Sequence, residues 1–254
     1  MSAITFPDSV VSSEGGGRIV LLVLDGLGGL PHEETGRTEL ETAVTPVMDE
    51  LASRSSLGML IPVEYGVTPG SGPGHLGLFG YDPTRFVIGR GVLSALGVGF
   101  ELQPGDVAAR LNLASLDSEG RVTDRRAGRP TDEVGRGLVA QVEAGLKPIP
   151  GVEVFLRHVK EHRAVVILRG AGLEEGVDDT DPQQIGVPPL PARAEHPGAA
   201  RTAEVLQAFL DQATGILADA GSPIGFLARG IACYAAPPSF RERFGLRAAV
   251  VARY

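Results

Sequence analysis

The segment Thr68–Pro83, TPGSGPGHLGLFGYDP, places a single serine, Ser71, among three glycines and two prolines before an apolar run begins. Pro73 suits the first turn of a helix, so Ser71 is expected just before the N-terminus of that helix. Unpaired N–H groups and the positive end of the helix dipole favour an anion such as phosphate there, and glycines let an oxyanion approach the backbone. Ser71 is therefore a candidate nucleophile, and a helix cap in a glycine-rich turn is the alternative. No GxxxxGKS/T pattern surrounds it, which excludes a nucleotide P-loop.

A second residue with chemical potential, Asp25, follows the short unbroken apolar run Arg18–Leu24. Such a run is typical of a strand buried on both faces of a parallel sheet, and ligand sites form at the carboxyl ends of these strands. A serine nucleophile needs a base or a metal ion to activate it, and Asp25 is a hard oxygen donor for a divalent ion. The alternative is that Asp25 caps a helix.

Positive charge gathers in the middle of the chain. Guanidinium groups bind phosphate and carboxylate through paired hydrogen bonds, so several arginines that converge from different loops suit a small polyanionic metabolite. The alternative is a solvated face on which they pair with Asp124, Asp178, Asp179 and Asp181; residues 178–182 are interpreted as a solvated, turn-rich segment. The polar residues concerned are Arg110, Asn112, Asp124, Arg125, Arg126, Arg129, Arg157, His158, His162 and Arg163.

An α/β framework is expected to position these residues. Buried strands are predicted from apolar runs at residues 18–24, 57–61 and 246–252, the last returning to the sheet of the first. Further strands are predicted from the pattern of residues 107–123, 152–159 and 163–169. Besides the helix after Ser71, helices are predicted at residues 45–55, 132–146 and 199–220. Residues 170–197 are expected to form a long loop, and residues 104–238 a separate α+β module.

The bulk properties exclude several classes of protein. The 254 residues are 43% hydrophobic and 21% charged, and no apolar run is long enough to cross a bilayer. A net charge of -8 argues against a nucleic-acid partner. A single cysteine excludes an internal disulfide framework, and residues 1–17, a loose lead-in, lack the pattern of a secretion signal. We expect a cytoplasmic protein with no membrane partner, and a homo-oligomer is left open.

The sequence resembles the archaeal-type, cofactor-independent phosphoglycerate mutases, metal enzymes of the alkaline phosphatase superfamily. The resemblance runs across nearly the whole chain in six ordered blocks, which is more specific than any one motif. They are VLDGLGGLP, GRTELETAVTPVMDELA, PGSGPGHLGLFGYDP, IGRGVLSALGVG, PGDVAARLNLASLDSEGRVTDRRAGR and PPSFRERFGLRAAVVA.

The resemblance implies an alkaline-phosphatase-like α/β domain with helices on both faces, residues 18–103 plus 239–254, interrupted by an inserted substrate domain at residues 104–238. It implies interconversion of 3-phosphoglycerate and 2-phosphoglycerate through a phosphoserine, without 2,3-bisphosphoglycerate. Two divalent ions would take part, with Mn²⁺ favoured over Mg²⁺, Co²⁺ or Zn²⁺. Ser71 would be nucleophile and metal ligand, and Asp25 a metal ligand. Substrate would be held by Arg110, Asn112, Asp124, Arg125, Arg126, Arg129, His162, Arg163 and Arg229.

Two departures from the family pattern bear on function. Gly72-Pro73-Gly74 stands where the family usually has Asp-Thr-Ala, which removes a carboxylate beside the nucleophile. The family carries its remaining aspartate and histidine ligands beyond the return strand, whereas here no histidine follows His196 and no aspartate follows Asp219. We therefore expect residues 1–254 alone to be inactive as a mutase. Two alternatives stay open: a metal-dependent phosphatase or phosphotransferase of the same superfamily, and a non-catalytic short form that binds a phosphorylated metabolite.

Overall fold

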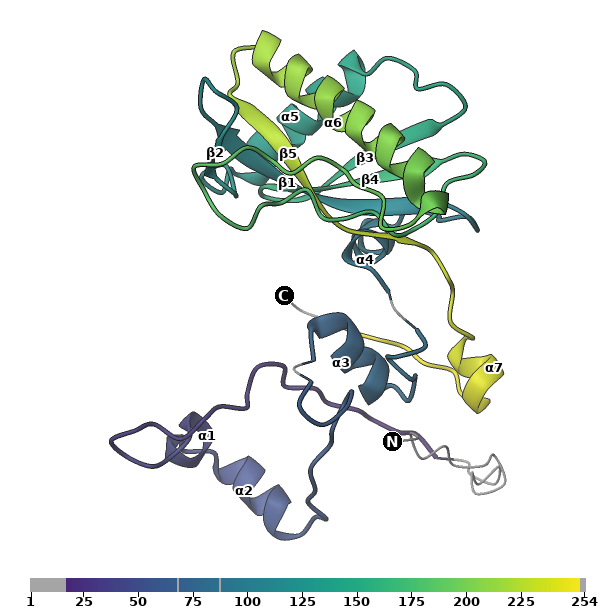
Figure 1. Ribbon diagram of the computed structural model, residues 1–254. Coiled ribbons are helices and arrows are strands. Elements are labelled where there is room, and N and C mark those ends of the chain that lie inside the picture. The colour runs from purple at the N-terminus through teal and green to yellow at the C-terminus, as the bar shows by residue number, and fades with distance from the viewer. Residues whose placement is uncertain (1–16, 68, 87, 252–254) are drawn as a thin grey trace. The chain divides into compact units, whose positions relative to one another are not determined.

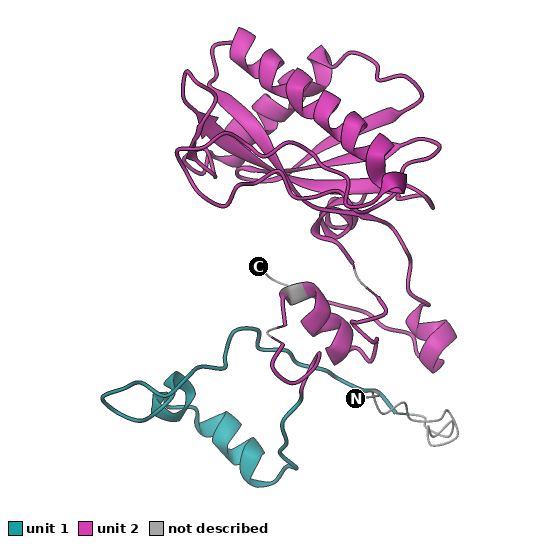
Figure 2. Cartoon of the chain, in the orientation of Figure 1, with its two compact units in different colours: residues 1–60 teal, residues 61–254 magenta. Residues whose placement is uncertain are grey.

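The computed structural model describes residues 17–67, 69–86 and 88–251 of the chain (Figure 1). The chain divides into two compact units, residues 1–60 and residues 61–254 (Figure 2). The lead-in expected at residues 1–17 lies, apart from its last residue, outside the described residues.

The described part of the first unit contains two helices, α1 (Glu39–Thr42) and α2 (Pro46–Ser53). In α1, the hydroxyl of Thr38 accepts from the N–H of Glu41, while the Glu41 carboxylate accepts from the N–H of Thr38. This reciprocal cap satisfies N–H groups that the helix cannot pair internally. The helix predicted at residues 45–55 is confirmed as α2, with Pro46 at its start.

Three predicted strands are not found. Residues 18–24, 57–61 and the described part of 246–252 form neither helix nor strand. Many of their apolar side chains are exposed, Ile19 by 83% and Met59 by 99%. A β-strand is held by hydrogen bonds to a neighbouring strand, and no described segment pairs with these runs. The parallel sheet that they were expected to form is therefore missing from the described structure, although the α/β class itself is confirmed.

The second unit is built on an antiparallel five-stranded sheet whose central strand is β1 (Val107–Leu116). β1 pairs with β4 (Arg163–Arg169) on one side and with β5 (Ile224–Cys233) on the other. β3 (Glu153–Lys160) continues the sheet beyond β4, and β2 (Val122–Asp124) pairs with the end of β1. The strands predicted within 107–123, 152–159 and 163–169 are confirmed. β5 was not predicted, because Gly225, Arg229 and Gly230 interrupt its apolar pattern.

The two faces of this sheet are covered differently (Figure 1). Helices α5 (Asp132–Gly145) and α6 (Ala200–Asp219), both predicted, lie on one face and enclose the main core with alternate residues of β1. On the opposite face, α4 (Arg90–Gly97) packs Val92 and Ala95 against Ala108, Val165, Ile167 and Ala232. A short 3₁₀ turn, η2 (Pro197–Ala199), leads into α6. None of the helices in the described residues is long and apolar enough to cross a membrane.

The helix that begins at Ser71, α3 (Ser71–Leu78), is followed by an aromatic cluster that includes α7 (Phe240–Phe244). The Phe79 and Phe240 rings lie 6.0 Å apart, and the hydroxyl of Tyr81 donates to the carbonyl of Pro238 at 2.6 Å. Aromatic pairs in this arrangement add to the stability that area burial provides. The cluster therefore anchors the C-terminal end of α3 to α7.

Close packing of α4 on the sheet gives a testable prediction. A Cβ added at Gly91 would collide with the carbonyl group of Ala108, whereas one added at Gly97, in the last turn of α4, would meet nothing within 4 Å. We expect Gly91→Ala to lower the free energy of unfolding by about 1–3 kcal/mol, as overpacking does. Gly97→Ala is the matched control and should be neutral or slightly stabilising. Equal unfolding midpoints for the two variants would contradict the observed packing.

Candidate functional site

The register of the sheet gathers polar residues from three strands on the α4 face. Side chains alternate along a strand, so Leu111 and Leu113 point into the main core while Arg110 and Asn112 point to the other face. Arg110 is opposite Arg229 on β5, and Asn112 is opposite Arg163 on β4. Directly opposed residues share a face. We call this set, Arg110, Asn112, Arg163 and Arg229, the arginine patch; it lies on the same face as α4.

His162 adds an imidazole beside the arginine patch. It lies in the tight turn between β3 and β4, is 2% exposed, and is preceded by Glu161 with a positive φ of 51°. Burial lowers the pKa of His162, and the charges of Arg163, Arg126 and Arg110 act in the same direction, against Glu161. The ring is therefore neutral near pH 7.

Several polar atoms of this region are buried and make no hydrogen bond to any residue that the structure describes. They are Oδ1 of Asn112, Nδ1 of His162 and Nε of Arg163. A buried polar atom without a partner costs free energy, and native structures pair most of them. Donors and acceptors of this kind, close to several guanidinium groups, could bind an anionic, hydroxylated ligand.

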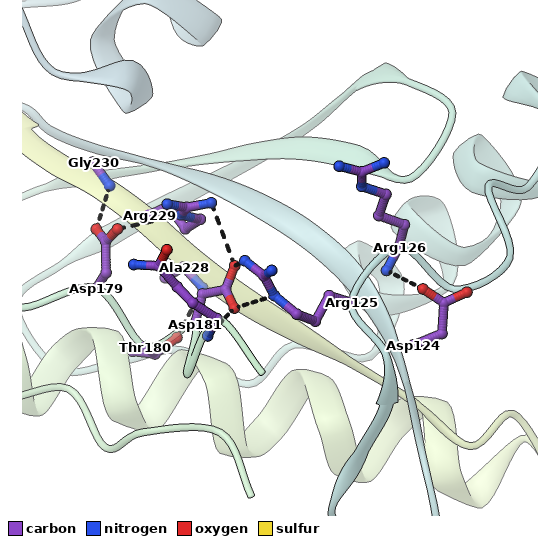
Figure 3. A network of polar contacts seen from close by, with 10 residues as sticks. Asp124, Arg125, Arg126, Asp179, Thr180, Asp181, Ala228, Arg229 and Gly230 are labelled. Carbon is purple, nitrogen blue, oxygen red and sulfur yellow. Dashed lines mark hydrogen bonds and ion pairs between the residues drawn. The ribbon is translucent and has the colours of Figure 1, made fainter. Parts of the chain in front are cut away.

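The loop after β2 carries the DRRAGR block and brings further residues to the site. The Asp124 carboxylate accepts from the N–H groups of Arg126 and Gly128 at 2.8 and 2.7 Å, and these bonds hold its pKa below the usual range. The carboxylate of Asp124 therefore stabilises the conformation of this loop through these hydrogen bonds. Arg126 extends away from this bond in Figure 3, and Arg129 is exposed.

Arg125 joins Arg229 through a shared carboxylate (Figure 3). Arg125 donates from Nε and Nη2 to the two oxygens of Asp181 at 2.8 and 2.7 Å. Nη1 of Arg229 lies 3.5 Å from the same carboxylate, and its Nε donates to Asp179 at 3.3 Å. Pairing of the arginines with Asp179 and Asp181 is thus confirmed, but the interpretation of 178–182 as solvated is wrong for Thr180 and Asp181. Both are buried because the loop packs against β5.

Left-handed backbone marks the loops around the site. Among the described residues, the non-glycine positions with positive φ are Ala127, Arg129, Glu161 and Gln183. Two lie in the DRRAGR loop, one precedes His162, and one follows Asp181 by two residues. This conformation is unfavourable for residues with a Cβ and tends to occur at functional sites. The strain was not visible in the sequence, because none of the four is a glycine or asparagine.

Arg157 and His158 do not join the site. Arg157 is exposed and pairs with Glu143 of α5 at 2.9 Å. The ring of His158 contacts the carbonyl of Glu161 at 2.9 Å, and a Cβ added at Gly135 of α5 would also meet it. These two residues belong to the packing between β3 and α5.

The expected nucleophile and metal ligand belong to different units. Ser71 is the first residue of α3 rather than the residue before it, with Gly70 as the N-cap. Asp25 lies in the first unit, in an exposed turn where Gly26 has a φ of 80°. No cluster of three or more histidine, cysteine, aspartate or glutamate side chains occurs in the part of the chain that the structure describes. Asp25 and Ser71 are oxygen donors of the kind that Mn²⁺ and Mg²⁺ prefer, but alone they are too few for such an ion.

The fold and the site define an α/β protein with a candidate site for a small polyanion. The sequence model described as 2,3-bisphosphoglycerate-independent phosphoglycerate mutase matches residues 52–221. Proteins named probable 2,3-bisphosphoglycerate-independent phosphoglycerate mutase are 49% identical over 93% of this chain in Thermus thermophilus and 43% identical over 97% in Aquifex aeolicus. The chain belongs to the 2,3-bisphosphoglycerate-independent phosphoglycerate mutase family. It spans 58% and 62% of the length of these two relatives.

Solved structures are also similar to this chain, among them the following two. A cofactor-independent phosphoglycerate mutase from Thermoplasma acidophilum has a TM-score of 0.57 at 33% identity, over 87% of this chain and 60% of that one. The PH0037 protein from Pyrococcus horikoshii has a TM-score of 0.65 at 30% identity, over 87% of this chain and 53% of that one.

Burial of neutral His162 predicts a pH dependence of stability. Its pKa is lowered in the folded chain from a value of about 6.5. As the pH falls below 6.5, the unfolded chain takes up a proton that the folded chain resists, so the free energy of unfolding should decrease. His162→Gln should remove this component between pH 6.5 and 5, whereas His32→Gln, on an exposed loop, should retain it. The measurement is urea unfolding across this range; the same slope in all three proteins would contradict the burial of a neutral ring.

Proposed function

We propose that this chain carries the phosphoglycerate-binding and phosphoryl-accepting residues of a mutase that interconverts 3-phosphoglycerate and 2-phosphoglycerate. The observation that carries the proposal is the arginine patch, in which side chains from three adjacent strands share one sheet face beside neutral His162. Membership of the family and the names of its relatives support this choice of substrate.

The chemistry of the substrate matches the patch. Phosphoglycerate carries a phosphate, a carboxylate and a hydroxyl, and guanidinium forks bind the first two through paired hydrogen bonds. Neutral His162 and the amide of Asn112 can bond the hydroxyl, since each has a buried atom that no described residue pairs with. Binding would thereby satisfy polar atoms that are costly in the free chain.

We propose Ser71 as the phosphoryl acceptor. Its oxygen would lose a proton and bond to phosphorus as the bond from phosphorus to the substrate oxygen breaks, and the departing oxygen would take up a proton to leave glycerate in the site. The other glycerate hydroxyl would then lose its proton and take the phosphoryl group back, and Ser71 would regain a proton, so that no water is consumed. N–H groups at the start of α3 would stabilise the charge on the phosphoryl oxygens. Arg110, Asn112, Arg163 and Arg229 would hold the glycerate between the two transfers, and a closed site would keep out water, which would otherwise hydrolyse the phosphoserine.

The glycines around Ser71 support a site for a bulky anion. An added Cβ would meet nothing closer than 3.9, 3.5 and 3.6 Å at Gly70, Gly72 and Gly74, and none of the three has a positive φ. Neither the packing of the described residues nor the backbone conformation therefore requires glycine there. Close approach of a ligand to the backbone would account for them.

We also propose, from the resemblance, that Asp25 and Ser71 contribute oxygens to a site for two divalent ions, with Mn²⁺ favoured over Mg²⁺, Co²⁺ or Zn²⁺, and that 2,3-bisphosphoglycerate is not required. Such ions would supply charge neutralisation at the phosphoryl group. Two oxygen donors are too few to hold this pair of ions. A cytoplasmic location and a homo-oligomer remain predictions.

Product analysis separates the mutase from the alternatives. For residues 1–254 mixed with 3-phosphoglycerate and Mn²⁺, we expect binding with negligible 2-phosphoglycerate, because Asp25 and Ser71 alone cannot complete the metal site. Phosphorus NMR measures 3-phosphoglycerate, 2-phosphoglycerate and free phosphate. Robust conversion to 2-phosphoglycerate would contradict the view that the metal site lacks ligands. Release of free phosphate without 2-phosphoglycerate would favour the phosphatase alternative.

Binding itself tests the patch. We expect Arg163→Met to weaken 3-phosphoglycerate binding by about 10-fold or more, as loss of a charge-assisted hydrogen bond does. Arg201→Met, which removes an exposed arginine from α6 on the other face, is the matched control and should bind as the parent does. Calorimetric titration gives both dissociation constants. Equal affinity of the two variants for 3-phosphoglycerate would show that Arg163 does not contribute to binding.

A further inference from the structure

The loop that contains Asp179, Thr180 and Asp181 binds two arginines of the site, Arg125 and Arg229, through its carboxylates (Figure 3). We propose that Asp181 is a positioning residue, which holds Arg125 and Arg229 so that their remaining N–H groups face the anionic ligand of the arginine patch. This inference rests on the proposed function, because the ligand is phosphoglycerate.

The hydrogen bonds of Asp181 leave part of each guanidinium available. The carboxylate takes the Nε and Nη2 edge of Arg125, at 2.8 and 2.7 Å. A guanidinium has five N–H donors, so the Nη1 and Nη2 edge of Arg125 can still form a second fork with phosphate or carboxylate. Arg229 is held through Nε by Asp179 and lies with Nη1 3.5 Å from Asp181, which leaves its Nη2 for a ligand.

Asp181 is itself held rigidly. Its side chain is wholly buried, and Oδ1 also accepts from the N–H of Gln183 at 2.9 Å. The preceding Thr180 is tied to β5, where its N–H donates to the carbonyl of Ala228 and its hydroxyl accepts from the Ala228 N–H. Asp179 accepts from the N–H of Gly230 at 2.6 Å. Since the loop is bonded to the strand that carries Arg229, carboxylate and guanidinium are fixed in one frame.

The buried carboxylate of Asp181 lies close to the positive charges of Arg125 and Arg229. Arg110 and Arg229 are directly opposed on neighbouring strands, and like charges in that position repel. Asp181 offsets this repulsion before a ligand arrives. A carboxylate there also repels an anion, so charge balance alone would predict tighter binding once the charge is removed. Positioning predicts weaker binding, and the two accounts therefore differ in sign.

The experiment compares two carboxylates with the same local geometry. Asp106 is 1% exposed and accepts from Nε and Nη2 of Arg169 at 2.8 and 2.7 Å, the same distances as in the pair of Asp181 and Arg125. Asp106→Asn is thus a matched control for loss of a buried, doubly hydrogen-bonded pair. Both variants should unfold at lower temperature than the parent. In calorimetric titration with 3-phosphoglycerate, Asp181→Asn should weaken binding by about 10-fold or more, while Asp106→Asn should bind as the parent does.

Asp179→Asn provides a second variant that should fold, because Asp179 is partly exposed. It should weaken binding less than Asp181→Asn, since it frees Arg229 alone. Parental or tighter binding by Asp181→Asn would overturn the positioning role and leave the proposed function standing. If Asp181→Asn is unfolded, parental binding by Asp179→Asn overturns it instead. Failure of the parent chain to bind 3-phosphoglycerate would overturn both.

Discussion

Pairing of β1 with a strand on each side is the interaction on which the rest of the second unit depends. Because side chains alternate along a strand, this register sends Leu111 and Leu113 into the core under α5 and α6 and turns Arg110 and Asn112 to the other face. A slip of β5 by one residue would turn Arg229 toward α6 and bury its charge in the core. The same hydrogen bonds that stabilise the sheet therefore set the composition of the candidate site, so that one register specifies both the fold and this site.

Concentration of charge on this face has an electrostatic cost that the chain offsets in part. Asp179 and Asp181 balance Arg229 and Arg125, and burial keeps His162 neutral. Non-glycine residues with a left-handed backbone conformation, in three loops, add backbone strain. Polar atoms of Asn112, His162 and Arg163 still lack hydrogen bonds to the described part of the chain. Such a surface is poor for stability by itself but well arranged for an anionic ligand, whose binding would recover the cost.

Much of this could be predicted from the sequence, and the failures have physical causes. Amphipathic periodicity predicted α6 and alternation predicted β1, while the sequence patterns of residues 132–146, 152–159 and 163–169 predicted α5, β3 and β4. The short helices α1 and α7 were not predicted, although each begins with a capping box, Thr38 to Glu41 and Ser239 to Glu242. The runs at 18–24, 57–61 and 246–252 were expected to be strands because an apolar run indicates burial, yet a strand also needs a neighbour. The site residues were chosen by residue type and family resemblance; the role of Asp181 depends on a long-range contact with Arg125 that no local pattern encodes.

The central claim is that the arginine patch binds phosphoglycerate through side chains of β1, β4 and β5. Its most direct test is an NMR titration of the isotopically labelled 254-residue chain with 3-phosphoglycerate. The account predicts that the largest shifts occur at the Nε–H groups of Arg163 and Arg229, the side-chain amide of Asn112 and the ring of His162, while the amides of α6 are unaffected. The account would be contradicted if the resonances of these groups did not change and the chemical-shift changes occurred instead on the face covered by α5 and α6.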